Sequence, residues 1–232
     1  LMIIGGAALA VVVAIVVVVM LATQGPKNKP AAKPTATPTA APVTGGGGRV
    51  DAVLLGAQDI GTILGDPNME SAGHGDQLRP QQGTLSNPEC LGAFEPLQES
   101  VYRSFGPTAM RSDVLHTAGN DPAHRVVEAV ASFESAEKAR AFVETSAEKW
   151  RTCAGQNVTL TGTNGKANEW SVGNVTGAAP KIAQIRTEAE GRSCQHVLSA
   201  VSDVVIDVQA CGTDISDGAG RMAEQMATRA AR

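Results

Sequence analysis

Residues 194–211 read CQHVLSAVSDVVIDVQAC, and this stretch predicts the centre of the fold. Two runs rich in Val, Ile and Ala flank Ser202 and Asp203, a pattern typical of two antiparallel strands joined by a short turn. We expect these strands at Arg192–Val201 and Val204–Ala210. Ser-Asp is not the favoured dipeptide for a two-residue turn, but a four-residue turn about the same centre gives the same strand pairing.

The hairpin register brings the two cysteines of this stretch together. Cys194 and Cys211 lie at equal distances from the centre of the turn, so they form a directly opposed pair. Counted outward from the turn, this pair is non-hydrogen-bonded, and the Cα atoms of such pairs are about 4.5 Å apart. That separation is at the short end of the range that a disulfide accepts, so we expect a bridge between these two cysteines.

The same register defines a polar group on the face that carries both cysteines. His196 lies opposite Gln209, and Asp207 is diagonal to His196 and within reach of its side chain. These three residues are candidates for the lining of a ligand cleft. The alternative is a half-solvated sheet face with ordinary cross-strand hydrogen bonds.

Two predicted helices carry the other two cysteines. Apolar residues recur at spacings of three and four from the predicted N-cap Ser135 to Cys153, which indicates one long amphipathic helix. A second helix is predicted from Asn87-Pro88 to the Gly-Pro pair at 106–107. One face of that helix carries Cys90, Phe94, Leu97 and Val101. Each helix therefore buries one cysteine, and antiparallel or crossed packing of the two helices favours a Cys90–Cys153 bridge.

Four cysteines allow three connectivities, and the two arguments independently select 90–153 and 194–211. The alternative is four free buried thiols in a cytosolic protein. Disulfides require an oxidising compartment, so the predicted pairing indicates a domain outside the cytoplasm.

The remainder of the chain divides into further helices, strands and a loop. Helices are predicted at Asp51–Leu64 and at Ser216–Ala230, the latter with Met222 and Met226 facing inward. The stretch Asn68–Leu85, rich in Gly and polar residues, is predicted to be a long surface loop. Other strands are predicted at Thr108–His116, His124–Phe133, Asn157–Thr161, Asn168–Val175 and Lys181–Glu188.

The first 49 residues form two segments of different character. Leu1–Ala22 is apolar and uncharged, and at about 1.5 Å per residue it is long enough to cross a bilayer, so a transmembrane helix is predicted at 1–22. A cleaved signal peptide is the alternative, although its apolar core is usually shorter and follows basic residues. Residues 23–49, rich in Pro, Thr, Ala and Gly, are a predicted disordered linker, and residues 50–232 are a predicted folded domain.

Two observations conflict over the orientation in the membrane. Lys27, Lys29 and Lys33 follow the apolar run and would keep the C-terminal part in the cytoplasm. The four cysteines require an oxidising space instead, and we give them more weight. The chain does not begin with Met, so we expect it to be the membrane-proximal piece of a longer protein.

Composition and motifs argue against several classes of function. From Arg49 onward the chain has 16 basic and 23 acidic residues, a net charge of −7, which gives no general attraction for nucleic acid. No Cys-x-x-Cys, His-Glu-x-x-His, Gly-x-Ser-x-Gly or phosphate-loop motif occurs, and the four histidines are scattered. We therefore expect no catalytic residues, no cofactor, no metal ion and no nucleic-acid partner.

Three features of the folded part together resemble a known family. They are the opening helix with Val53-Leu54-Leu55 and Ile60-Gly61-Thr62-Ile63-Leu64-Gly65, the four-cysteine spacing, and the helix end Trp150-Arg151-Thr152-Cys153. The chain resembles the extracytoplasmic sensor domain of mycobacterial serine/threonine protein kinases of the PknH type. The resemblance implies an α+β domain with a central antiparallel sheet, two disulfides and a cleft for an unidentified ligand. It also implies a kinase domain before Leu1, although relatives without a kinase exist.

These features together predict a sensor held in the cell membrane by a single span, with its C-terminal domain extracytoplasmic. It would bind an unidentified small molecule or envelope component and regulate a serine/threonine protein kinase through a ligand-dependent homodimer. Gly5-Gly6-Ala7-Ala8 would allow two membrane helices to approach closely. The alternative is a free-standing docking protein that binds cell-wall polymer or another envelope protein. A deep pocket favours the sensor, and a flat apolar patch favours docking.

Overall fold

The computed structural model describes residues 46–232. The transmembrane helix predicted at 1–22 and nearly all of the linker predicted at 23–49 lie outside these residues. Helix α1 (Gly46–Asp51) includes Gly46–Gly48, so the end of the predicted linker is helical rather than unstructured. Between residues 46 and 232, no helix combines the length and the apolar character needed to cross a membrane.

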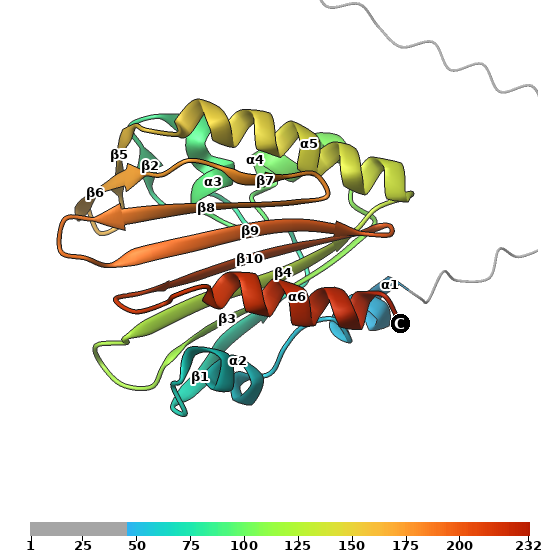
Figure 1. Ribbon diagram of the computed structural model, residues 1–232, viewed down its shortest axis with the longest axis horizontal. Coiled ribbons are helices and arrows are strands. Elements are labelled where there is room, and N and C mark those ends of the chain that lie inside the picture. The colour runs from blue at the N-terminus through green and yellow to red at the C-terminus, as the bar shows by residue number, and fades with distance from the viewer. Residues whose placement is uncertain (1–45) are drawn as a thin grey trace, which may run out of the picture. The chain divides into compact units, whose positions relative to one another are not determined.

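One large antiparallel sheet forms the centre of the domain (Figure 1). Its strands follow the order β1 (Met69–Gly75), β3 (Ala109–Thr117), β4 (His124–Ser132), β10 (Val204–Gly212), β9 (Ser193–Val201), β8 (Lys181–Glu188), β6 (Ala167–Val172), β5 (Asn157–Thr161) and β2 (Thr84–Leu85). The short strand β7 (Thr176–Ala178), which the sequence did not predict, pairs with one end of β8. The antiparallel sheet implied by the family resemblance is therefore confirmed.

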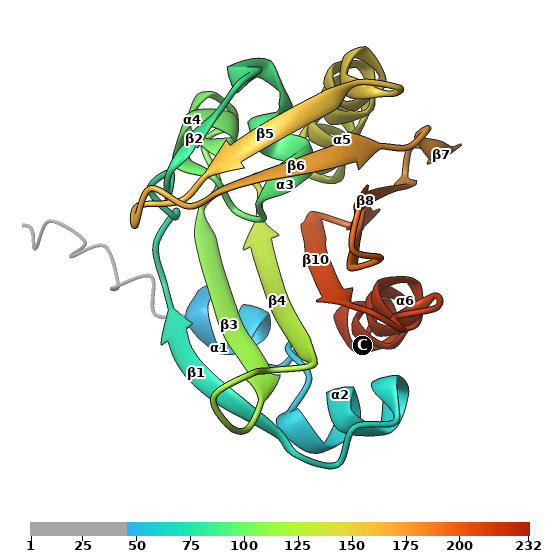
Figure 2. The same ribbon diagram turned by 90° about the vertical axis from the view of Figure 1, so that its left-hand side faces the viewer.

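Helices cover both faces of this sheet (Figure 2). On one face lie α1, α2 (Ala57–Leu64) and α6 (Gly218–Ala230). On the other lie η1 (Pro88–Cys90), α3 (Leu91–Phe94), α4 (Glu99–Tyr102), η2 (Arg103–Phe105) and α5 (Ala136–Cys153). Successive residues of β10 alternate between the two cores, with Val204 and Ile206 in the first and Val205 in the second. Every residue of β10 is therefore buried, and the half-solvated face considered for this hairpin is wrong.

The two strongest local predictions are confirmed. Strands β9 and β10 pair in the expected register around a two-residue turn, with Val201 opposite Val204. In that turn Ser202 has a φ of 54°, a left-handed conformation that tight hairpin turns require. Helix α5 begins as expected, because the Ser135 side chain accepts a hydrogen bond from the Lys138 N–H at 3.3 Å.

The helix predicted at Asp51–Leu64 is two helices. α1 ends at Asp51, and α2 begins only at Ala57. Between them the Leu55 N–H donates to the Glu128 carboxylate of β4 at 2.9 Å, and not to a carbonyl four residues earlier. A tertiary contact therefore interrupts an apolar pattern that looks continuous in the sequence.

The stretch Asn68–Leu85 is not the long loop that we predicted. It contains β1 and β2, and the sheet ends on these two strands. Six of the seven residues of β1 are not buried, so this edge strand has no alternation of apolar and polar residues that would have revealed it.

The helix predicted from residue 87 to 106 is wrong as one element. Asn87 does accept a hydrogen bond from the Glu89 N–H as an N-cap, but the chain then forms η1, α3, α4 and η2 with an irregular stretch at 95–98. Within that stretch Leu97 has a φ of 57°, and its N–H donates to Asp207. A hydrogen bond to the sheet therefore replaces one within the helix.

The C-terminal helix agrees with expectation apart from its start. α6 begins at Gly218 rather than Ser216, and both Met222 and Met226 are buried. It lies along β9 and β10, whose apolar residues it covers (Figure 1).

Candidate functional site

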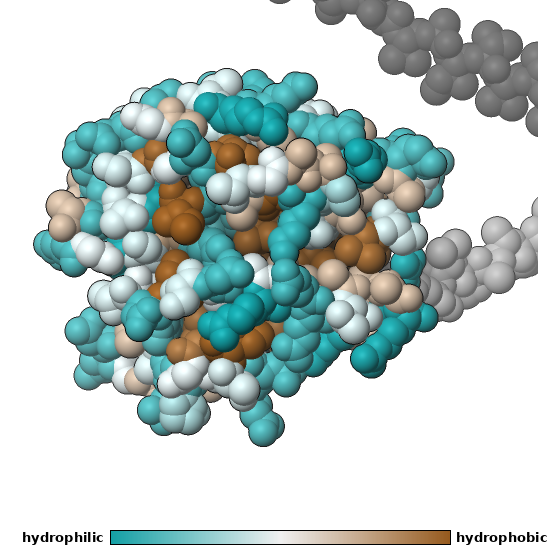
Figure 3. All heavy atoms as spheres, in the orientation of Figure 1, coloured by the Kyte–Doolittle hydropathy of each residue, from teal (hydrophilic) through white to brown (hydrophobic). Residues whose placement is uncertain are grey.

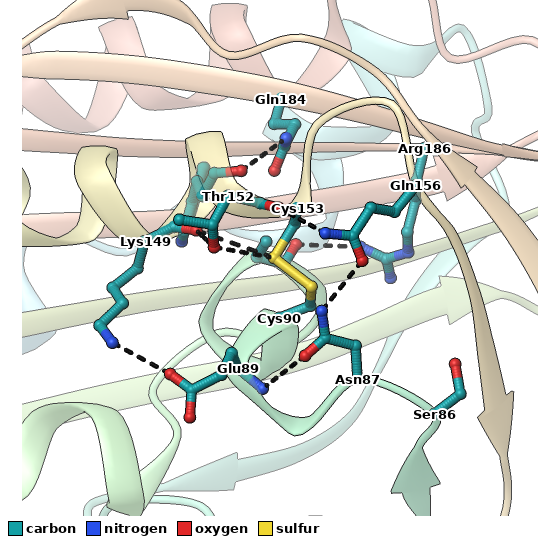
Figure 4. Close-up of a disulfide and its surroundings, with 12 residues drawn as sticks. Ser86, Asn87, Glu89, Cys90, Lys149, Thr152, Cys153, Gln156, Gln184 and Arg186 are labelled. Carbon is teal, nitrogen blue, oxygen red and sulfur yellow. Dashed lines mark hydrogen bonds and ion pairs between the residues drawn. A yellow bond between two sulfur atoms is a disulfide. The ribbon is translucent and has the colours of Figure 1, made fainter.

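Both predicted disulfides are present. Cys90–Cys153 joins η1 to the end of α5 with Cα atoms 5.7 Å apart, and both side chains are fully buried (Figure 4). Around it, Asn87 donates to Gln156 at 2.9 Å, and Lys149 and Glu89 form an ion pair at 3.0 Å. Cys194–Cys211 joins opposed residues of β9 and β10 with Cα atoms 4.0 Å apart.

The two bridges close loops of different length, so their contributions to the free energy of unfolding should differ measurably. Replacing both Cys90 and Cys153 with Ala should lower the free energy of unfolding by about 3 kcal/mol, because this bridge closes a long loop between separate elements. The same change at Cys194 and Cys211 should cost about 1 kcal/mol less, because that bridge closes a loop of only 17 residues and so removes less entropy from the unfolded chain. Urea unfolding of the two double variants tests this, and equal losses would contradict it.

The three predicted ligand-binding residues lie close together but deep in the protein. His196, Asp207 and Gln209 are each no more than 2% exposed. The His196 Nε2 atom is 2.5 Å from Asp207 Oδ1, and its Nδ1 atom is 3.0 Å from the Ala93 carbonyl oxygen. A carbonyl oxygen can only accept, so the His196 Nδ1 atom is the donor in the hydrogen bond to Ala93.

The same side chains hold the segment 93–102 on the sheet. The Asp207 Oδ2 atom accepts from the Leu97 N–H at 2.9 Å and from the Tyr102 hydroxyl at 2.7 Å. Gln209 donates to the Phe94 carbonyl oxygen at 2.6 Å. Burial, together with the charge of Asp207, raises the pKa of Tyr102 above its ordinary value, so this hydroxyl is a permanent donor. The group therefore has a structural role, and its role in ligand binding stays a prediction.

A buried arginine that the sequence did not single out holds the same segment. The Arg186 guanidinium lies 4.4 Å from the centre of the Phe94 ring and 4.9 Å from that of Trp170. It donates to the Ala93 carbonyl oxygen and to Gln209 Oε1, both at 3.3 Å. Burial lowers the pKa of Arg186 to about 10, which still leaves it charged at neutral pH. Stacking on the two rings stabilises this cation.

A cavity of about 520 Å³ lies between this segment and α5. One wall comes from η1, α3, α4 and η2, and the other from α5. The lining residues are Gln81, Pro88, Glu89, Leu91, Gly92, Ser100, Val101, Ser104, Phe105, Phe142, Thr145, Ser146, Lys149 and Trp150. None of the three predicted ligand-binding residues is among them. One wall of the cavity consists of four short elements, where the sequence predicted one continuous helix.

A second buried polar group lies on the other face of the sheet. Glu128 of β4 is fully buried, and opposite it in β3 is Asp113, also buried. One Glu128 oxygen accepts from the Leu55 N–H, and the other has no partner in residues 46–232. Burial is the main cause that raises the pKa of Glu128 to about 8. The Asp113 and Asp59 carboxylates act in the same direction, and the Leu55 N–H and Arg229 oppose the shift.

These features define the class: an α+β domain, stabilised by two disulfides, with a cavity of ligand size between two helical walls. The chain belongs to the PknH-like extracellular domain family, whose sequence profile matches residues 46–229. The resemblance inferred from the cysteine spacing and the helix ends is thus confirmed.

Comparison with individual proteins supports the same family membership. The chain is 37% identical over 180 residues to the serine/threonine-protein kinase PknH of Mycobacterium bovis and to that of Mycobacterium tuberculosis. The aligned part is 77% of this chain but only 30% and 29% of those two proteins. The crystal structure of the extracellular domain of PknH from M. tuberculosis superimposes with a TM-score of 0.76 at 36% identity, covering 79% of this chain and 95% of that one.

Proposed function

We propose that this chain is the ligand-binding, extracytoplasmic part of a membrane-anchored serine/threonine protein kinase. The observation that carries the proposal is the cavity of about 520 Å³, which lies within the size range of small-molecule sites. Membership of a family of extracellular domains and two disulfides support a position outside the cytoplasm. The apolar segment 1–22 would be the anchor.

The two walls of the cavity suggest how a ligand would act. The wall formed by residues 88–105 is attached to the sheet through Asp207, Gln209 and Arg186, and α5 is attached to that wall through the Cys90–Cys153 bridge. A ligand that touches both walls would favour one spacing between them. It would alter the pairing of two chains only if one arrangement binds it more tightly than the other.

The docking alternative receives less support. Among residues 46–232 Ile185, at 44%, is the one large apolar side chain that is exposed. On the face seen in Figure 3, polar residues interrupt the apolar ones, which gather in hollows between α5 and α6. A flat apolar docking patch would be broader and continuous.

Retention of envelope molecules tests the proposal. Residues 46–232, oxidised and immobilised, would be exposed to an envelope extract beside two variants of α5. Thr145→Trp places a bulky ring on the cavity lining, and Glu148→Trp places the same ring on α5 outside it. We expect at least one small molecule to be retained by the wild type and by Glu148→Trp but not by Thr145→Trp.

Mass spectrometry of the eluted molecules decides between the outcomes. Equal retention by Thr145→Trp would mean that the cavity is not the binding site. If nothing is retained from extracts of several growth conditions, the sensor function loses its support.

A further inference from the structure

The cavity has an apolar floor. Its apolar side chains are Leu91, Val101, Phe105, Phe142 and Trp150. Phe105 and Phe142 meet edge to face, with ring centres 5.1 Å apart. Gly92 lies directly beside this floor, since a Cβ atom there would be in ordinary van der Waals contact with Val101 at 3.4 Å and with Trp150 Nε1 at 3.5 Å. A short hydrocarbon group placed on this floor would leave water for an apolar surface.

Polar groups without a protein partner surround the floor. Within residues 46–232, no hydrogen bond engages the hydroxyl groups of Ser100, Ser104, Thr145 and Ser146 or the indole N–H of Trp150. Ser146 is only 6% exposed and Trp150 only 2%. Ser100, Ser104 and Thr145 are exposed, and neither the Ser146 hydroxyl nor the Trp150 indole N–H is a fully enclosed unpaired group, so water or a ligand can reach all five. A hydroxyl group both donates and accepts, and therefore suits a rim that contains serine, threonine and indole.

The charges on the lining cancel. Glu89 and Lys149 are its only charged residues, and they pair with each other at 3.0 Å across the two walls (Figure 4). A charged ligand would have to displace either Glu89 or Lys149 from its partner in this ion pair. An uncharged ligand leaves the pair intact.

We infer that the cavity binds an uncharged amphipathic molecule with a hydroxylated head and a short hydrocarbon group, the chemistry of an alkyl glycoside. The hydrocarbon lies on Phe105, Phe142 and Val101, and the head meets the hydroxyl groups and the Trp150 indole. This inference rests on the proposed function and names the class of ligand for its site.

Octyl β-glucopyranoside, used below its micelle concentration, is a suitable probe. Residues 46–232 contain both cores and both disulfides, and the matching PknH extracellular domain was crystallised as a separate chain, so this part serves for the test. The protein has two tryptophans, so its nitrogen-15 spectrum should show two indole signals, assigned with Trp170→Phe. We expect the probe to move the Trp150 signal and to leave the Trp170 signal in place.

Matched controls test three parts of the inference: the need for a hydroxylated head, the need for an uncharged ligand, and the location of the binding site. Octyl sulfate, which keeps the hydrocarbon and adds a charge, and glucose, which keeps the head alone, should both bind at least tenfold more weakly than the probe. Thr145→Trp should abolish the shift, whereas Glu148→Trp should retain it. Ser146→Ala should weaken binding of the probe about fivefold, as expected for one lost hydrogen bond, and leave binding of octanol unchanged.

The outcomes separate this inference from the proposed function. If octyl sulfate binds as tightly as octyl glucopyranoside, or if both indole signals move together, the ligand class is wrong. If the extract contains a charged molecule that Thr145→Trp fails to retain, the class is wrong and the sensor function stands. If neither probe nor extract engages the cavity, both are overturned.

Discussion

Replacing Asp207 with Ala is expected to lower the free energy of unfolding by about 4 kcal/mol, because it removes a buried acceptor from three donors. The Leu97 N–H, the Tyr102 hydroxyl and the His196 ring would all lose their partner at once. The backbone at 95–98 would then lose its main attachment to β10. Urea unfolding at neutral pH measures the loss, and hydrogen exchange at the Leu97 amide reports whether the segment is released.

Asp203 provides the control in the same hairpin. It pairs with Arg49 at 2.8 Å near the surface, so Asp203→Ala should cost less than about 1 kcal/mol. Because Tyr102 and Asp207 share one hydrogen bond, Tyr102→Phe should cost much less in the Asp207→Ala background than in the wild type. Similar stabilities for the two Asp variants would show that the buried hydrogen bonds do not hold the segment.

Glu128→Gln is expected to stabilise the protein at alkaline pH. Burial raises the pKa of Glu128 to about 8 in the folded state from 4.5, the ordinary value of an exposed carboxyl. The folded protein therefore holds a proton that the unfolded chain releases, so wild-type stability falls as pH rises from 4.5 to about 8. At about 1.4 kcal/mol per pH unit, the variant should gain roughly 4 kcal/mol over the wild type at pH 8.5 and almost nothing near pH 4.5.

The comparison must be made as a difference between two proteins, since other groups titrate in the same range. Unfolding free energies of wild type and Glu128→Gln would be measured from pH 4.5 to 8.5, with Glu148→Gln as an exposed control. The difference should grow with pH for Glu128→Gln and stay flat for the control. A flat difference for both would mean that Glu128 is ionised in the folded protein at neutral pH.

The sequence predicted the register of the β9–β10 hairpin to the residue, and the strand ends to within two residues, for two physical reasons. The side chains of a strand alternate between faces, so a register error of one residue would reverse both faces, and a turn of two residues allows no slack. Helix α5 could also be predicted from neighbouring residues alone. The N-cap Ser135 specifies where this helix begins, and its stripe of apolar residues specifies which face is buried. The Cys194–Cys211 bridge followed from the hairpin register, whereas the Cys90–Cys153 bridge was predicted from the faces of two helices, of which only α5 forms as one element.

The elements that were missed depend on distant partners. The apolar spacing of residues 87–106 favours a helix, but Asp207, more than a hundred residues later, takes the Leu97 N–H. Likewise, Glu128 takes the Leu55 N–H and separates α1 from α2. Strand β1 pairs with β3 at the edge of the sheet and has no apolar face of its own to reveal it.

For the candidate site, the closeness of His196, Asp207 and Gln209 could be predicted from the hairpin register, because cross-strand neighbours follow from counting residues outward from the turn. Their burial under a second layer, and their hydrogen bonds to the segment 93–102, come from chain packing that a local pattern does not contain. The cavity also belongs to the tertiary structure alone. One wall is the segment 88–105, whose course depends on a hydrogen bond from Leu97 to the distant Asp207, and the other wall is α5. No local periodicity encodes how these two segments face each other.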